Sequence, residues 1–247
     1  MLHLCFQFFF ELFEKSVYIK KYIKEQKYDI ALKELKGYEK RIKTYKKLYY
    51  QFIYMCNAII QKKTGNIDEA KILFKKSLEC TIPNFEEINL KEYYLSNQEI
   101  EIILEYVNII SSNNEAVEFK NILFNLYKVM SRESLIELSK NRMYPKVCYL
   151  CTNVLYKEGN YELSQDITKN ALDALALTGN LNYRADIIYL NTLSKLKLEP
   201  NGNYIDEFLD AYYLADFYGQ DMLANQIEDK VREVYKWGSI DEVPLLS

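Results

Sequence analysis

The residue types that most often carry chemistry are sparse in this sequence. Cys148 and Cys151 form a C-x-x-C pair, which on a helix places two thiols one turn apart. A structural zinc site needs four ligands, and the sequence holds no second C-x-x-C and no H-x-x-H motif. His3 is the single histidine, which leaves almost no candidate for a histidine-based triad or for general acid–base catalysis. We interpret the cysteine pair as helix packing and expect no metal and no other cofactor.

Acidic pairs and glycine turns do not combine into a catalytic site. The pairs Glu86-Glu87, Asp206-Glu207 and Asp241-Glu242 lie where helices are expected to begin, or in the C-terminal tail. Carboxylates at such positions complement the helix dipole or are simply solvated. The turns GNIDEA and GNYIDEF lack both the second glycine and the lysine of a phosphate-binding P-loop. We therefore predict that the chain is not an enzyme.

Four asparagines have positions that favour peptide binding, because each falls inside an expected first helix of a helix pair, upstream of the turn. Asparagine is a poor residue for the middle of a helix. Its amide, however, donates to a peptide C=O and accepts from a peptide N–H at once. Nearby tyrosines would add apolar area and one hydrogen bond each. The alternative is that an Asn-rich chain places asparagine everywhere. The predicted peptide-binding residues are Asn57, Asn108, Asn153, Asn191, Tyr106, Tyr156 and Tyr189.

The elements that would position these side chains are paired helices. In KKTGNIDEAKILFKKSLE (62–79), Ala70, Phe74 and Ser77 follow the Gly65-Asn66 turn at intervals of 4 and 3. These intervals place the three side chains on one helical stripe, where a small residue lets a neighbouring helix approach closely. The Gly-Asn pair suits a left-handed helix C-cap. The same spacing recurs at Ala31, Leu35 and Tyr38, at Ser164, Thr168 and Ala171, and at Tyr204, Phe208 and Ala211.

The distances between these stripes predict a solenoid. The anchors Ala31, Ala70, Ser164 and Tyr204 lie 39, 94 and 40 residues apart, and the 94 leaves room for a degenerate unit around 105–127, where Asn113-Asn114 replaces the glycine turn. The chain has only 7 glycines and 4 prolines, which favours an all-α protein. We predict an all-α, right-handed superhelical solenoid of about five helix hairpins, roughly twelve helices, in which a helix near 221–236 caps the array.

These hairpins resemble tetratricopeptide repeats (TPRs) with longer helices. The order of blocks is similar to the sensor domain of TPR-containing regulators from low-GC Gram-positive bacteria, the Rgg–PlcR–Rap group of peptide-pheromone receptors. The blocks are YDIALKELKGYEK (28–40), KLYYQF (47–52), the stretch 64–103 with TIPNF and YYLSNQEIEII, YPKVCYLCTNVLYKEGNYELS (144–164) and DAYYLADFYGQDMLANQI (210–227). The resemblance covers about residues 20 to 236. It implies a regulatory sensor domain that binds a short linear peptide in its concave groove and relays this to transcriptional control. The alternative is a TPR scaffold or adaptor that docks a protein partner without a small ligand.

The chain departs from this group at its N-terminal end. Such regulators usually begin with a helix-turn-helix DNA-binding domain, whereas here only a short aromatic-rich stretch precedes the first repeat. We expect no such domain in these residues, so the chain is either the sensor part of a longer protein or a stand-alone array. In either case we expect no direct DNA binding by this chain alone. The expected division is a linker helix at 1–16, the repeat domain at 17–236 and a tail at 237–247. Residues 1–63 hold fourteen Lys/Arg and six Asp/Glu, a net of +8 in a chain of net −3. This excess indicates either solvated helix faces or a neighbouring anionic group.

Cysteine usage and the first residues indicate a cytoplasmic protein that does not enter a membrane. Five cysteines, an odd number, suggest a reducing compartment. The opening MLHLCFQFFFELFEKS is apolar, but it has no basic n-region and is too short to span a bilayer. We expect it to form a helix whose aromatic side packs on the array or on a partner. The expected partners are a short signalling peptide or protein segment and, in a homodimer, a second copy of the chain.

Overall fold

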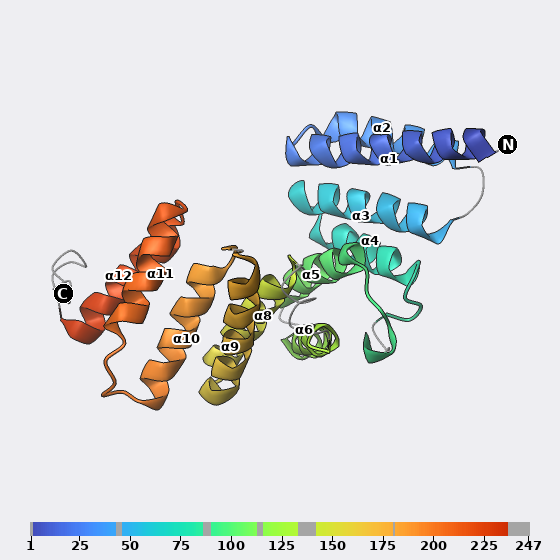
Figure 1. Cartoon of the computed structure of the whole chain (residues 1–247). Coiled ribbons are helices and arrows are strands. Elements are labelled where there is room, and N and C mark those ends of the chain that lie inside the picture. Colours follow the sequence, from blue (N-terminus) through green and yellow to red (C-terminus); the bar gives the residue numbers. More distant parts are fainter. Residues whose placement is uncertain are drawn as a thin grey trace. The chain divides into compact units, whose positions relative to one another are not determined.

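The structure, a computed structural model, describes residues 2–42, 46–85, 90–112, 116–132, 142–179 and 181–236. Within these residues it contains eleven α-helices and one short 3-10 helix, and no strand (Figure 1). The chain divides into two compact units, unit 1 (Met1–Ile122) and unit 2 (Leu123–Ser247). The all-α prediction is therefore confirmed for the described residues. The expected tail at 237–247 lies outside them.

Unit 1 is built from successive helix pairs. Its elements are α1 (Leu2–Lys24), α2 (Tyr28–Arg41), α3 (Lys47–Lys63), α4 (Ile67–Glu79), the 3-10 helix η1 (Leu90–Glu92), α5 (Asn97–Ser112) and the start of α6 (Ala116–Met130). α1 packs on α2, α3 on α4, and α4 on α5. α1 also packs directly on α3, so the first helices of two consecutive pairs are neighbours. This adjacency creates a face made of first helices.

Unit 2 repeats the same arrangement with five helices after α6. They are α8 (Tyr144–Lys157), α9 (Tyr161–Thr178), α10 (Arg184–Leu198), α11 (Ile205–Phe217) and α12 (Asp221–Tyr235). Consecutive helices pack on one another, and α8 also packs on α10. The helix expected near 221–236 is thus present as α12. The degenerate repeat around 105–127 falls on α5 and α6, and its Asn113-Asn114 turn lies outside the described residues.

The predicted stripes are the buried faces of the second helices. Nearly all the anchors are buried, namely Ala31, Leu35, Tyr38, Ala70, Phe74, Ser77, Ser164, Thr168, Ala171, Phe208 and Ala211. Tyr204 is the exception, since it is the half-buried N-cap of α11. The small polar anchors bond to the neighbouring helix. The Ser77 hydroxyl donates to the Gln51 carbonyl at 2.7 Å, and the Ser164 and Ser194 hydroxyls lie 2.8 Å apart.

Four turns between helices share one backbone geometry. Gln26, Gly65, Gly159 and Gly219 have φ values of 59°, 88°, 79° and 65°, in the left-handed region. The following residue donates its N–H to a carbonyl five positions back, as Asn66 does to Gln61 and Asn160 does to Leu155, both at 2.9 Å. This is the Schellman arrangement, which satisfies the last carbonyls of the preceding helix. The Gly-Asn turns were predicted, whereas the left-handed Gln26 is a finding of the structure.

Gln51 is the centre of a buried polar network in unit 1. Its side chain is 1% exposed, donates to Thr81 Oγ1 at 2.7 Å and accepts from Gln98 Nε2 at 3.0 Å. These bonds tie α3 to the turn after α4 and to α5. A buried amide is costly unless its polar atoms are paired. The network therefore fixes the positions of α3, the turn after α4 and α5 along one another.

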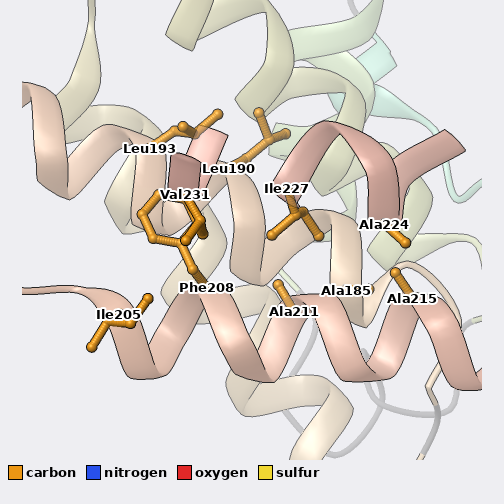
Figure 2. Close-up of a cluster of buried hydrophobic side chains, with 10 residues drawn as sticks. All are labelled: Ala185, Leu190, Leu193, Ile205, Phe208, Ala211, Ala215, Ala224, Ile227 and Val231. Atoms are coloured by element: carbon orange, nitrogen blue, oxygen red, sulfur yellow. The ribbon is translucent and has the colours of Figure 1, made fainter. Parts of the chain in front are cut away.

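The core of unit 2 between α10, α11 and α12 combines one large ring with small residues. Figure 2 shows Phe208, Ala211 and Ala215 following one face of α11, with Ala224, Ile227 and Val231 of α12 in the same cluster. The Phe208 ring is fully buried and meets the rings of Tyr189 and Tyr235, with centroids 6.1 and 6.4 Å away. The alanines permit a close approach of the two backbones, and the rings fill the space at one end.

Two features of the N-terminal helix concern its length and its aromatic side chains. α1 is continuous from Leu2 to Lys24, and the expected bound between residues 16 and 17 stays a prediction. Its buried side carries Leu12 and Ile19. Phe10 and Phe13 are 62% and 66% exposed, so these two rings do not pack on the array. Packing of this aromatic side on a partner stays a prediction.

Candidate functional site

A cavity of about 650 Å³ lies on the face that the first helices of unit 1 form. Three first helices, one turn and the start of α2 supply its walls. We call it the lysine groove, and its residues are Lys20, Ile23 and Lys24 of α1, Gln26 of the first turn, Tyr28 at the start of α2, Met55, Cys56, Ile59, Lys62 and Lys63 of α3, and Glu101, Glu105 and Asn108 of α5. The volume falls within the range of about 300–1,000 Å³ that is typical of ligand sites.

The lysine groove carries more positive than negative charge. Four lysines and two glutamates line it, a net of +2. Lys62 pairs with Glu105 at 2.8 Å, and the two side chains are half-buried. The Lys20 ammonium lies 6.0 Å from the centre of the Phe52 ring. Lys24 and Lys63 are exposed at the rim. A cleft with one dominant sign of charge raises the local concentration of ligands of the opposite sign.

The floor of the groove is apolar. Met55 and Cys56 are buried there, and Ile59 is half-buried. Burial raises the pKa of the Cys56 thiol to about 12, while nearby Lys20 lowers it and Glu101 raises it. The thiol is thus protonated at neutral pH and acts as a small apolar group. The groove offers apolar contact at the bottom and charge at the rim.

Of the predicted site residues in unit 1, the structure places one in the groove. Asn108 is exposed on α5 and lines the cavity. Asn57 is half-buried on α3, and its amide donates to the Ile53 carbonyl one turn back at 3.1 Å. Tyr106 is 0% exposed, and its hydroxyl donates to Glu118 at 3.1 Å. Because its ring is completely covered, Tyr106 is a core residue in this structure, and the expected peptide contact by this ring is corrected.

The predicted residues of unit 2 lie on its own first helices, α8 and α10. Asn153 is half-buried on α8. Asn191 accepts a hydrogen bond from Thr168 of α9 at 2.9 Å, so it joins two helices. The Tyr189 hydroxyl donates to the Gln226 carbonyl of α12 at 3.3 Å. Burial raises the pKa of Tyr189 to about 12, and the nearby groups Tyr156, Glu233 and Asp229 add to the shift. Tyr156 is half-buried, with its ring 5.5 Å from that of Tyr161.

The cysteine pair and the one acidic pair that the structure describes lie in the core and at a helix start. Cys148 and Cys151 are buried on α8, and burial raises the pKa of Cys148 to about 12. Asp206 and Glu207 begin α11, where Glu207 pairs with Lys195 at 3.2 Å. The other two acidic pairs lie outside the described residues. Within the described part of the chain, no three His, Cys, Asp or Glu side chains gather as a metal site would require.

The groove residues other than Asn108 were missed, although the sequence contains a signal for them. Lys20 and Lys24 are four apart, and Glu101, Glu105 and Asn108 follow at intervals of 4 and 3. Each set therefore shares one helical face. The net charge of +8 over residues 1–63 points to the same end of the chain. The sequence does not say which face of α1, of α3 and of α5 lines a common cavity.

In the ranges that the structure describes, no helix is both long and apolar enough to cross a lipid bilayer. No protein-family model matches the chain. No curated protein matches it in sequence. Among solved structures, the chain is similar to PlcR of Bacillus thuringiensis in its apo form, with a TM-score of 0.63 and 14% identity over 91% of this chain and 79% of that one. At this identity the likeness concerns the fold: the chain is an array of helix hairpins of the kind that PlcR contains.

Proposed function

We propose that the protein is a regulatory sensor domain that binds a short linear peptide in the lysine groove. The observation that carries the proposal is a cavity of about 650 Å³ on the first-helix face of unit 1, with an apolar floor and a charged rim. The sequence blocks that resemble peptide-pheromone receptors and the fold shared with PlcR support the same class of function. A transcriptional output, to which occupancy of the groove is relayed, belongs to the proposal.

The peptide's chemistry follows from the walls of the groove. Its backbone would bond to the Asn108 amide, which can donate and accept at once. Its apolar side chains would lie over Met55 and Ile59, and acidic side chains or its terminal carboxylate would meet Lys20 and Lys24. One neutral hydrogen bond contributes about 1 kcal/mol, whereas a micromolar complex requires about 8 kcal/mol. Burial of apolar side chains, at roughly 25 cal/mol per Å² before ordering costs, must supply much of the difference.

Unit 2 contributes a separate set of proposed peptide contacts. Asn153, Tyr156 and Tyr189 lie on its first helices and keep the combination of amide and ring that suits a peptide backbone. Asn57 and Asn191 remain proposed contacts as well, and each also makes a hydrogen bond within the protein. Asn153→Ala tests this second set, and loss of one hydrogen bond should weaken binding about fivefold.

A cytoplasmic location and a homodimer complete the proposal. The described cysteines Cys56, Cys80, Cys148 and Cys151 are buried thiols outside any disulfide, which suits a reducing compartment. The dimer rests on the resemblance of the sequence blocks. Its mass in solution, measured by light scattering across a concentration series, tests it directly.

The test of the groove begins with a heptapeptide library displayed on phage, selected on the purified chain. Enriched peptides are synthesised with a fluorophore, and their affinities are measured by anisotropy. We expect an excess of Asp and Glu among them. Lys24→Glu should weaken binding about fivefold or more and make it less dependent on salt. Asn108→Ala should weaken binding about fivefold through one lost hydrogen bond.

The matched control is Lys33→Glu, which makes the same charge change at an exposed position of α2 outside the groove. This variant should bind like the wild type. If the selected peptides bind Lys24→Glu and Asn108→Ala as tightly as the wild type, the groove is not their site. If selection enriches no peptide at all, a scaffold that docks a protein partner becomes the better reading.

A further inference from the structure

A second cavity, of about 710 Å³, lies within unit 2 and has a different chemistry. It is formed where the connection between α9 and α10 meets the turn between α11 and α12. Its lining residues are Gly179, Leu181, Asn182, Tyr183, Ala185, Asp186, Leu214, Tyr218 and Gln220. We call it the Asp186 cavity. Among these residues Asp186 carries the one charged side chain, so the cavity favours positive charge, unlike the lysine groove.

The Asp186 carboxylate lies among neutral groups in the cavity. It is half-buried, and Gln220, whose side chain is neutral, also lines the cavity. Burial raises the pKa of Asp186. An ionised carboxylate has about four acceptor positions and no donor, so it pairs with groups that donate hydrogen bonds. A desolvated carboxylate is stabilised most by a cation that also donates hydrogen bonds.

Aromatic rings and aliphatic side chains complete the cavity. Tyr183 has φ 61° and ψ 6°, a left-handed conformation that a bulky residue rarely adopts. Its ring stacks on that of Tyr149, with centroids 5.7 Å apart. Tyr218 lines the cavity from the end of α11 and is half exposed. A cation near the face of a tyrosine ring gains electrostatic energy. Leu181, Ala185 and Leu214 offer apolar contact for an aliphatic stem.

The position of Asp186 in the first turn of α10 has an ordinary explanation, since acids there complement the helix dipole. That explanation accounts for the carboxylate but not for a hollow of about 710 Å³ with tyrosine rings on its wall. Water alone could fill a polar hollow, but the aliphatic side chains in the wall would gain nothing from it. An alkylammonium group satisfies the carboxylate, the rings and the aliphatic side chains together.

We propose that the Asp186 cavity binds a primary ammonium group on an aliphatic stem, as a lysine side chain or the amino terminus of a peptide presents it. The ammonium would donate to the Asp186 carboxylate beside the tyrosine rings, and the stem would lie on Leu181 and Leu214. The site belongs to unit 2. Its test does not depend on whether a peptide binds in the lysine groove.

The experiment uses the full chain and three small probes at constant ionic strength. Nα-acetyl-lysine methylamide offers a side-chain ammonium, leucine amide offers an α-ammonium, and butyrate offers an aliphatic stem with the opposite charge. Binding is followed by saturation-transfer NMR, and dissociation constants come from titrations. We expect at least one amine to bind and butyrate not to bind. Binding of the lysine probe alone assigns a side chain as the source, and binding of leucine amide alone assigns an amino terminus.

Two variants and one control decide the role of the residues. Asp186→Asn should weaken amine binding about tenfold, because a charge-assisted hydrogen bond is roughly twice as strong as a neutral one. Tyr218→Leu should weaken it about threefold through loss of a ring face, and this exposed position leaves the fold intact even if Asp186→Asn does not fold. Asp216→Asn removes the same charge from an exposed position outside the cavity, and it should have no effect. The proposal is wrong if neither amine binds the wild type, if butyrate binds equally, or if both cavity variants bind the amines like the wild type.

Discussion

Residues with a left-handed backbone conformation end several helices of this protein and let the chain reverse direction. Three of the four Schellman turns have glycine at the left-handed position, and the first has Gln26 at φ 59°. A residue with a Cβ atom is strained there by about 1–2 kcal/mol, whereas glycine is not. The same backbone therefore carries different strain in different repeats.

We predict opposite effects for exchanges at two of these turns. Gln26→Gly should raise the free energy of unfolding by about 0.5–1 kcal/mol, because relief of strain exceeds the added entropy of the unfolded chain. Gly65→Ala, at φ 88°, should lower it by about 1–2 kcal/mol. Urea titration measures both. Gly37→Ala on α2 is the control, since the same exchange inside a helix should not destabilise once the flexible Lys15 side chain moves aside. Equal effects at positions 65 and 37 would contradict this account.

Buried titratable groups make the fold sensitive to alkali. Burial raises the pKa of Cys56 and of Tyr189 to about 12, from ordinary values of 9.0 and 10.0. Both groups are neutral in the folded chain below pH 9. As the pH rises, the unfolded chain releases these protons first, so stability is lost between about pH 9 and 12.

Tyr189→Phe should reduce the rate at which the free energy of unfolding falls with rising pH. The variant loses the hydrogen bond to Gln226 at every pH, which lowers stability by a constant amount. The slope of unfolding free energy against pH, from urea titrations between pH 7.5 and 11, separates the two effects. Tyr213→Phe, at an exposed position of α11, should keep the wild-type slope. If Tyr189→Phe also keeps that slope, its phenol does not contribute to the alkaline loss.

At the scale of elements, helix pairs are joined by small residues and by polar contacts between neighbouring helices. α5 begins with a capping box, in which the Ser96 N–H and hydroxyl both donate to Glu99 at 2.7 Å and the Glu99 N–H donates to Ser96 Oγ at 3.3 Å. Such caps satisfy the first N–H groups of a helix. α11 and α12 are joined instead by alanines, which hold their backbones close together.

The alanine contact should not tolerate a larger side chain. Ala211→Leu places three extra carbons in a filled space between α11 and α12, and overpacking of this kind costs about 1–3 kcal/mol. We expect a lower midpoint in urea with little change in helix content. Ala176→Leu, the same exchange at an exposed position of α9, should change stability by less than about 0.5 kcal/mol. Equal stability of the two variants would mean that the contact between α11 and α12 can accommodate a leucine at position 211.

At the scale of the molecule, each unit has a hydrophobic core of its own. Met55, Phe74 and Ile102 are buried in unit 1, while Ile187 and Phe208 are buried in unit 2. In repeat arrays each element contacts mainly its neighbours, so stability is approximately a sum of local contributions. A destabilising substitution in one core should then lower local stability most in the helices next to it.

Phe208→Ala should reveal this locality. Removing the ring from a filled core costs about 3–5 kcal/mol, and we expect α10, α11 and α12 to lose protection first. Hydrogen exchange followed by mass spectrometry, with peptides from α3 and α4 as the internal reference, measures the distribution. Protection in α3 and α4 should stay close to that of the wild type. If every helix loses protection equally, the chain unfolds as one cooperative unit.

The amino-acid sequence by itself determined the helix pairs and their buried stripes. Ala70, Phe74 and Ser77 could be placed on one face because helical periodicity is a local property, and Gly65 marked its turn because few other residues accept positive φ. Gln26 has no such signature, so its turn geometry became visible only in the fold.

Only the tertiary structure decided which faces meet and what lies between them. Tyr106 and Asn108 are two positions apart on α5, yet one is covered completely and the other lines the lysine groove. Periodicity places them on different sides of the helix but does not say which side faces α1 and α3. The groove joins residues from Lys20 to Asn108, and the Asp186 cavity joins two connections. Such sites depend on packing between distant segments, which no local pattern contains.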